Sequence, residues 1–283
     1  MFDKQQYELL DFGRGRKLER LGGITIDRPA PGSEYVDRSD PTIWQAASAT
    51  FTRTSGKTGA WNLKREVSAS WQVLHNDIYF GLKPTPFGHV GLFPEQVENW
   101  DWIEKQLQRS QRQPKVLNLF GYTGGSSLTS AVGGAEVVHV DAAKNIVGWA
   151  RQNAENSQLD QHPIRWIVED TQKFVARELR RGNRYDAVIL DPPSYGHGPK
   201  GEVWKMERDL GDLLKSCAKL TKDRLQFMLL TCHTSDWGTR NLEQLVRDSF
   251  GKDVDLGLYA GTMFLRSSLG RDLPSGSVVR WPC

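Results

Sequence analysis

Cysteine is scarce in this chain. Only three cysteines occur among the 283 residues, Cys217, Cys232 and Cys283, and none of them is paired at the spacing of metal ligands. The scarcity argues against a disulfide-stabilised secreted domain and against a zinc site. It predicts a reducing, cytoplasmic location and no metal.

Long apolar runs and a strong net charge are missing too. No run approaches the roughly 20 residues that cross a membrane, and the first residues lack the basic head and apolar body of a secretory signal. The composition, 38% hydrophobic and 25% charged, is typical of a globular protein. A net charge of +3 permits nucleic-acid binding without indicating it. We expect no membrane partner, and the oligomeric state is left open.

A glycine-rich turn is the most informative feature that is present. The apolar strand 116–119 runs directly into the turn 120–125, and the first turns of a helix follow. Glycine lets a ligand approach the main chain closely, and such a turn at the edge of a parallel sheet can form a nucleotide-type pocket. The turn has neither the G-x-G-x-x-G spacing of a dinucleotide site nor a closing G-K-[ST]. It therefore indicates a nucleoside site without a pyrophosphate, or a simple strand-to-helix connection.

Acidic residues follow the next strands along the chain. The strand 136–141 ends in Asp141, about twenty residues beyond the turn, where an acid can bind both ribose hydroxyls. Strand 164–168 ends in Glu169-Asp170-Thr171, and strand 185–190 ends in Asp191-Pro192-Pro193. Strand ends gathered at a topological switch point are where such sheets bind ligands. Alternatively, Asp141 and Asp170 only cap the helices that follow them.

The alternation of strands and helices predicts an α/β fold with helices on both faces of a mostly parallel, seven-stranded sheet. We place this domain at residues 93–283. The expected helices lie at 97–107, 126–131, 144–156, 171–181, 206–220 and 241–250, and the later strands lie at 225–231, 254–259 and 278–281.

Residues 1–92 are predicted to form a small, mostly β domain. The segments 71–74 and 78–82 flank His75-Asn76-Asp77, which indicates a hairpin. The basic cluster of Arg14, Arg16, Lys17 and Arg20 is compatible with phosphate binding, although a solvated surface is the more ordinary interpretation. The domain is a candidate for positioning the substrate or RNA.

Together these segments resemble the class I S-adenosylmethionine-dependent methyltransferases, whose sheet is Rossmann-like. The resemblance extends from about Gly91 to Thr234. Within that class, the chain most resembles the large-subunit ribosomal RNA methyltransferases, which include the cytosine-5 enzyme acting on 23S RNA. The segments that carry it are Asn118-Leu119-Phe120-Gly121-Tyr122-Thr123-Gly124, Val140-Asp141, Ala150-Arg151-Gln152-Asn153, Glu169-Asp170, Leu190-Asp191-Pro192-Pro193-Ser194-Tyr195, and Phe93-Pro94-Glu95-Gln96 at the domain crossing.

The resemblance implies S-adenosylmethionine as cofactor, S-adenosylhomocysteine as product, and a role for each motif. The turn would wrap the methionine and sulfonium end, Asp141 would bind the ribose, and Asp170 the adenine amino group. Asp191 would lie beside the sulfonium. The remaining expected cofactor residues are Gln96, Phe120, Gly121, Tyr122, Thr123, Gly124, Ala142, Thr171 and Pro192.

The resemblance also implies methylation of a base in RNA, with ribosomal RNA as the expected partner, and the acceptor atom stays open. Amino-nitrogen enzymes place a base-stacking aromatic directly after the two prolines. Here Ser194 intervenes and Tyr195 follows, so Tyr195 either stacks on a base or packs over its own loop. Carbon-5 of a pyrimidine instead requires a thiolate that adds to carbon-6. Cys232 is the candidate nucleophile, with His233 beside it, and the alternative is a small buried apolar side chain.

Two further alternatives remain, a methyltransferase acting on a small molecule and a cofactor-binding assembly factor. The mild charge favours them, and the Asp-Pro-Pro-Ser-Tyr segment and the additional β domain favour RNA.

Overall fold

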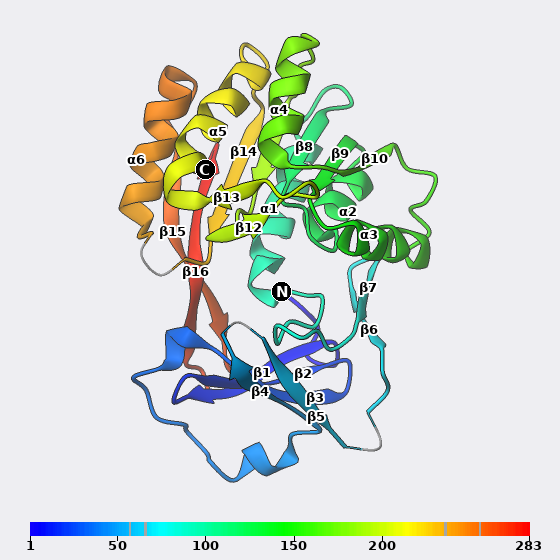
Figure 1. Cartoon of the computed structure of the whole chain (residues 1–283), viewed down its shortest axis with the longest axis vertical. Coiled ribbons are helices and arrows are strands. Elements are labelled where there is room, and N and C mark those ends of the chain that lie inside the picture. The colour runs from blue at the N-terminus through cyan, green and yellow to red at the C-terminus, as the bar shows by residue number, and fades with distance from the viewer. Residues whose placement is uncertain (57, 65–66, 235–236, 255) are drawn as a thin grey trace. The chain divides into compact units, whose positions relative to one another are not determined.

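The computed structural model describes residues 1–56, 58–64, 67–234, 237–254 and 256–283. The chain divides into two compact units (Figure 1). The first comprises Met1–Val97 together with Phe264–Ser275, and the second comprises Glu98–Met263 and Gly276–Cys283. The sequence placed residues 264–275 with the second unit. The structure groups them with the first, because Ser267 forms a β-bridge with Leu9.

The first unit is built on a five-stranded sheet in the order β1-β2-β3-β4-β5. Its strands are β1 (Tyr7–Gly13), β2 (Arg16–Leu21), β3 (Ile24–Pro29), β4 (Ala49–Ser55) and β5 (Thr58–Leu63), and only the β3–β4 pair is parallel. The turns between β1 and β2 and between β2 and β3 have positive φ at both central residues, as the twist of tight hairpins requires. The expected hairpin is confirmed as β6 (Trp71–His75) and β7 (Ile78–Leu82).

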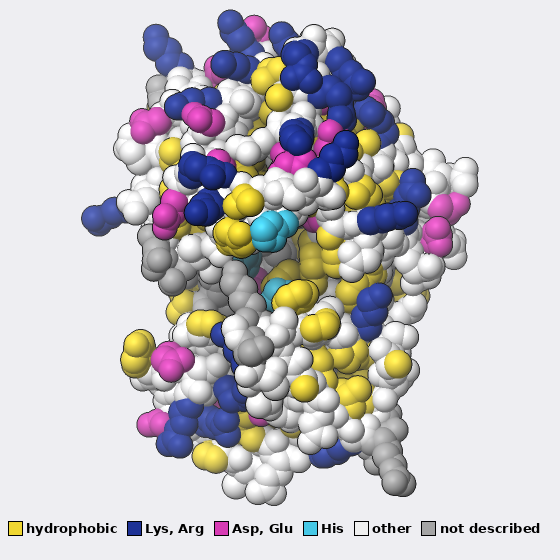
Figure 2. Space-filling model, viewed as in Figure 1, with side chains coloured by type: hydrophobic (Ala, Val, Ile, Leu, Met, Phe, Trp, Pro, Cys, Tyr) yellow, Lys and Arg dark blue, Asp and Glu magenta, His cyan; other side chains and the backbone are white. Residues whose placement is uncertain are grey.

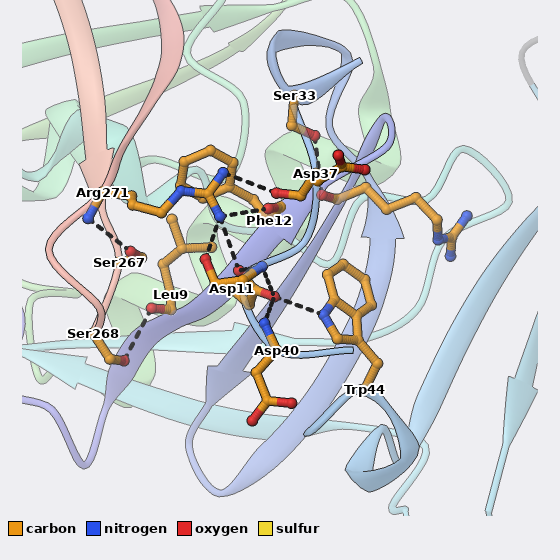
Figure 3. Close-up of polar contacts among 12 residues, drawn as sticks. Leu9, Asp11, Phe12, Ser33, Asp37, Asp40, Trp44, Ser267, Ser268 and Arg271 are labelled. Atoms are coloured by element: carbon orange, nitrogen blue, oxygen red, sulfur yellow. Dashed lines mark hydrogen bonds and ion pairs between the residues drawn. The ribbon is translucent and has the colours of Figure 1, made fainter. Parts of the chain in front are cut away.

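The buried carboxylate of Asp11 connects the N-terminal sheet of the first unit to that unit's later segment, Phe264–Ser275. Asp11 is 1% exposed and accepts hydrogen bonds from Trp44 Nε1 at 2.9 Å and from the Ser39 backbone N–H at 3.0 Å. Arg271 Nη1 donates to the same carboxylate at 3.4 Å (Figure 3). Burial alone would raise the pKa of Asp11, but the hydrogen bonds from Trp44 and from the Ser39 backbone lower it. Residues far apart in the sequence therefore share one ionised anchor.

The basic cluster near the N-terminus is paired with acids. Arg14 bonds Asp37, Arg16 bonds Asp27, Lys17 bonds Glu19, and Arg20 bonds Glu8. The Lys17–Glu19 pair is buried, and Arg28 also bonds Glu19. These cations neutralise the unit's own carboxylates, which argues against a phosphate site. The burial of Lys17 also departs from the solvated surface that was the alternative.

The second unit contains a seven-stranded sheet in the order β10-β9-β8-β11-β14-β16-β15, which confirms the predicted fold class. Its strands are β8 (Lys115–Leu119), β9 (Glu136–Asp141), β10 (Ile164–Val168), β11 (Ala187–Leu190), β14 (Phe227–Cys232), β15 (Tyr259–Arg266) and β16 (Asp272–Trp281). The first five pair in parallel, and β16 runs antiparallel to β14. The expected strand at 254–259 was wrong: β15 begins at Tyr259, and Asp255 lies outside the described residues.

Helices cover both faces of this sheet (Figure 1). They are α1 (Val97–Gln108), α2 (Gly125–Val132), α3 (Lys144–Asn156), α4 (Thr171–Arg180), α5 (Met206–Thr221) and α6 (Thr239–Phe250). Alternate strand residues such as Leu117, Leu119, Val138 and Val140 enter one core with α4, α5 and α6. The intervening residues face α1 and α2, as shown by Phe227 against Trp102 and by Asn118 bonding Ser127. Burial on both faces explains the continuous apolar runs of the parallel strands.

The remaining elements are short. A two-stranded hairpin, β12 (Tyr195–His197) and β13 (Val203–Lys205), follows β11. The 3₁₀ turns are η1 (Pro31–Ser33), η2 (Ile43–Ala46), η3 (Pro94–Gln96) and η4 (Gly251–Asp253). Among the described residues, no helix is both long and apolar enough to span a membrane.

Candidate active site

The carboxyl ends of five parallel strands meet at one edge of the second unit's sheet. Successive strand ends are joined through the main chain: Glu169 N–H donates to Asp141 O at 3.1 Å, and Gly121 N–H donates to Val140 O at 3.0 Å. β8 and β11 are neighbours, while the chain after β8 continues to β9 on the other side. This arrangement is a topological switch point, the usual ligand site of such sheets.

The turn after β8 has an unusual backbone. Phe120 and Tyr122 have φ values of 57° and 50°, in the left-handed region that non-glycine residues rarely occupy. Gly124, at 95°, is the N-cap of α2. Left-handed conformations of non-glycine residues cost on the order of 1–3 kcal/mol each and cluster at functional sites. Asn153 of α3 holds the turn by donating from Nδ2 to Thr123 O at 2.9 Å.

Gly121 is required for contact with the layer beneath rather than for positive φ. A Cβ at this position would lie 2.4 Å from a carbon of the His139 ring. His139 is fully buried, and its Nδ1 lies 2.9 Å from Ser127 Oγ, which accepts a hydrogen bond from Asn118 Nδ2. Burial lowers the pKa of His139 to about 3, so the ring is neutral.

Asp141 is held by backbone donors on both sides. Tyr122 N–H donates to Oδ2 at 3.0 Å and Ala143 N–H donates to Oδ1 at 2.9 Å. Burial raises the pKa of Asp141, and the two hydrogen bonds act in the opposite direction. Each oxygen has a second lone pair, so the carboxylate can still accept two hydroxyl hydrogens. The half-buried Ala142 follows it in the chain.

Asp170 lies at the start of α4 and caps that helix. Its Oδ1 accepts a hydrogen bond from Lys173 N–H at 3.0 Å, so the capping interpretation is correct for this oxygen. Among the described residues, Oδ2 has no hydrogen-bond partner. Asp170 and Thr171 are 8% and 3% exposed, so Oδ2 offers an acceptor for an amino group in an otherwise enclosed place.

Asp191 is oriented by two residues from the end of β14. Thr231 Oγ1 donates to Asp191 Oδ1 at 2.7 Å, and His233 Nε2 lies 3.6 Å from the same oxygen. Sequence reasoning placed His233 beside the Cys232 thiol and gave Thr231 no role. No local signal identifies either partner of Asp191, because β11 and β14 become neighbours only in the sheet.

Cys232 lies in the core that the sheet shares with α5 and α6. The residue is 1% exposed, and its Sγ is 3.8 Å from Met206 Sδ and 3.4 Å from the Thr234 backbone nitrogen. Burial raises the pKa of Cys232, and this effect outweighs the hydrogen bonds with Thr234, which lower it. These surroundings favour the neutral thiol over a nucleophilic thiolate.

Tyr195 lies on the hairpin that follows the two prolines. It is 43% exposed, and its ring meets His197 edge-on at a centroid distance of 5.1 Å. Behind it, Trp204 donates from Nε1 to Pro193 O at 2.7 Å and packs on Phe120. Its hydroxyl also lies 3.3 Å from His197 Nε2, so Tyr195 packs over its own loop, and base stacking remains a prediction.

The other expected residues are distributed between the two units. Gly121, Thr123 and Pro192 are buried in the second unit, around the glycine turn and the end of β11. Gln96 is buried in η3 of the first unit, and its contact with a cofactor remains a prediction.

The edge suits a nucleoside that carries a positive charge. Its acceptors are carboxylates at successive strand ends, the donors beside them are backbone N–H groups, and Phe120 adds an aromatic face. In the described part of the chain no group of three or more His, Cys, Asp or Glu is arranged to hold a metal. Fold and site together define a methyltransferase of the Rossmann-like class.

Comparison with known proteins gives the family. Residues 51–233 match the family model of S-adenosylmethionine-dependent methyltransferases. The crystal structure of the SAM-dependent methyltransferase from Agrobacterium tumefaciens is 36% identical, with a TM-score of 0.92 over 98% of this chain and 90% of that chain. The chain belongs to the S-adenosylmethionine-dependent methyltransferase family.

Two curated relatives have names that specify ribosomal RNA. Ribosomal RNA large subunit methyltransferase K/L of Pseudoalteromonas atlantica is 30% identical over 64% of this chain. Ribosomal RNA large subunit methyltransferase I of Aeromonas salmonicida is 36% identical over 38% of this chain. The matches cover only 24% and 27% of those proteins, so this chain spans about a quarter of each relative.

Replacing Gly121 by alanine tests the contact beneath the turn. We expect Gly121→Ala to lower the free energy of unfolding by about 1–3 kcal/mol, because the new methyl group meets a buried ring. Gly148→Ala is the matched control, since Gly148 has open space around it in α3, where alanine should add up to about 1 kcal/mol. Urea unfolding measures both. Equal effects of the two substitutions would contradict the assignment.

The neutral His139 predicts acid sensitivity. Its folded pKa of about 3 lies below the ordinary value of 6.5, so the unfolded chain binds more protons between these values. The contribution of His139 to the free energy of unfolding is therefore fully present above about pH 6.5 and is lost as the pH falls. Between pH 7.5 and 5.0 this one residue should lower the free energy of unfolding by about 2 kcal/mol. Urea titrations should show a flatter pH dependence in His139→Gln, and an unchanged slope would refute the buried neutral ring.

Proposed function

We propose that this chain transfers a methyl group from S-adenosylmethionine to a base of large-subunit ribosomal RNA. The observation that carries the proposal is the position of Asp191 and Tyr195, an oriented carboxylate followed by an exposed aromatic ring, beside the Phe120 turn. The names of the relatives support the choice of RNA. When bound, the cofactor supplies a methyl group activated by a positively charged sulfur.

The residues of the chain would then bind the cofactor and orient the acceptor base. Asp141 and Asp170 would hold the two ends of the nucleoside, and Asp191 would face the acceptor base, where its carboxylate can accept a hydrogen bond from an amino group or take up a proton. Holding donor and acceptor in line supplies much of the rate enhancement of such a transfer, up to about 7–11 kcal/mol in favourable cases. The surroundings of Cys232 favour an acceptor that requires no thiolate.

Charge supports RNA binding only weakly. Figure 2 shows Lys and Arg side chains spread over the upper part of this face, around α4 and α5, with acidic side chains among them. The net charge of +3 agrees with this mixture. We assign substrate positioning to the first unit, although its N-terminal basic cluster is neutralised by its own acids. The proposal also places the reaction in the cytoplasm, in keeping with three free cysteines.

Transfer of label tests the proposal. Purified protein, cofactor labelled in its methyl group, and ribosomal RNA from cells lacking the gene should give label in RNA. Mass spectrometry of the nucleosides should find one methylated base that is absent from the deletion strain. Label that appears only in small solutes would contradict the RNA proposal and favour the small-molecule alternative.

Two cysteine variants test, in the same assay, whether the methyl transfer requires a thiolate nucleophile. Cys232→Ala should keep the rate within about three-fold of wild type, because the thiol is buried and neutral. Cys217→Ala is the control for loss of a buried thiol, since Cys217 is fully buried in α5. A loss on the order of a thousand-fold in Cys232→Ala alone would instead establish the covalent route to carbon-5.

A further inference from the structure

The hairpin formed by β12 and β13 is joined to α4 by an ion pair. Lys173 Nζ donates to Glu202 Oε1 across a gap of 29 residues in sequence. The Glu202 side chain is only 14% exposed, whereas that of Lys173 is 57% exposed. Residues 196–201, at the end of β12 and in the turn after it, have the spacing G-x-G-x-x-G. They form a hairpin turn and do not open a helix, so they do not form a dinucleotide site.

The turn is built around the Glu202 carboxylate. Lys200 N–H donates to Oε2 at 2.8 Å, and Gly198 N–H donates to the Glu202 carbonyl at 2.8 Å. A Cβ on Gly198 would lie 2.4 Å from Oε2, so the glycine leaves the space that the carboxylate occupies. Glu202 is thus oriented toward α4 by its own loop.

Lys173 belongs to the helix that carries the proposed adenine acid. Its backbone N–H bonds Asp170 Oδ1, and its side chain bonds Glu202. One residue therefore connects the adenine end of the site with the hairpin tip.

The base of the hairpin is fixed at the other end of the site. Trp204 bonds Pro193 O and packs on Phe120, and Met206 N–H donates to Ser194 O at 3.1 Å. The hairpin consequently extends from the segment after Asp191 to the start of α4, along the rim where the cofactor is expected. Its exposed residues include Tyr195 and His197.

We propose that the Lys173–Glu202 ion pair latches this hairpin to α4 and thereby slows release of the cofactor. Lys173 and Glu202 are positioning residues in this account. The inference rests on the cofactor shared by the family and is independent of the acceptor. The hydrogen bond from Lys173 lowers the pKa of Glu202 to about 2, so both groups stay charged at neutral pH.

Loss of the ion pair should change the dissociation rate of the cofactor only modestly. Ion pairs that are open to solvent on one side contribute little free energy, so we expect a change of about two- to five-fold. High salt should remove most of it, since the Debye length falls to about 3 Å at 1 M. A contact that only stabilised the fold would change the unfolding midpoint and leave the salt dependence of release unaltered.

The experiment compares Lys173→Met with Lys173→Arg, which retains the charge, and with Lys200→Met. Lys200 lies in the same turn, and no ion pair joins its side chain to the described residues. Hydrogen exchange of the amides of residues 195–205 is measured without cofactor, and the dissociation rate of S-adenosylhomocysteine is measured by stopped flow at 0.1 M and 1 M salt.

We expect Lys173→Met alone to raise exchange in the hairpin and to speed release about two- to five-fold at 0.1 M salt, with the difference lost at 1 M. Lys173→Arg should behave like wild type. Unchanged exchange or release in Lys173→Met, or equal changes in Lys200→Met, would overturn the latch. Absence of S-adenosylhomocysteine binding to the wild-type protein would instead contradict the cofactor assignment, so the two failures are distinguishable.

Discussion

The carboxylate of Asp141 is the constraint on which the rest of the site depends. It accepts one backbone hydrogen bond from the glycine turn, through Tyr122, and one from the segment that leads into α3, through Ala143. Both bonds favour the ionised form and partly offset the burial, which raises the pKa of Asp141. In the proposed site, the remaining lone pairs of the carboxylate would accept the ribose hydroxyls.

The turn that bonds Asp141 has a strained backbone, which contacts from several elements stabilise. Phe120 and Tyr122 adopt left-handed backbone conformations, and the surrounding contacts stabilise them: Trp204 against the Phe120 ring, Asn153 on the Thr123 carbonyl, and the His139 ring beneath Gly121. The neutral His139 lets these layers approach closely, since a charged ring would be poorly solvated there. These contacts together fix the backbone conformation of the turn.

Much of the fold was predictable because its signal is local. The strands that end at Asp141 and Asp191 are buried on both faces, so they stand out as apolar runs with an acid behind them. The strand before Asp170 is at the edge of the sheet and is only partly buried, but its apolar residues still indicated a strand. The strand near the C-terminus was misplaced, because β15 alternates buried and exposed residues and its hairpin tip belongs with the first unit. Contacts between distant segments, such as Thr231 with Asp191 and Lys173 with Glu202, left no local pattern. The glycine turn was recognised, but the positive φ values of Phe120 and Tyr122 were not, since tertiary contacts impose them.

Calorimetric titration with S-adenosylhomocysteine is the most direct test of the central claim, that a nucleoside cofactor binds at Asp141. The wild-type protein should bind, and Asp141→Asn should bind about 10- to 100-fold more weakly, because hydrogen bonds to a charged acceptor contribute about 1.5–3 kcal/mol. Circular dichroism should show that the variant remains folded. Equal affinity in the folded variant, or no heat with the wild-type protein, would contradict the account.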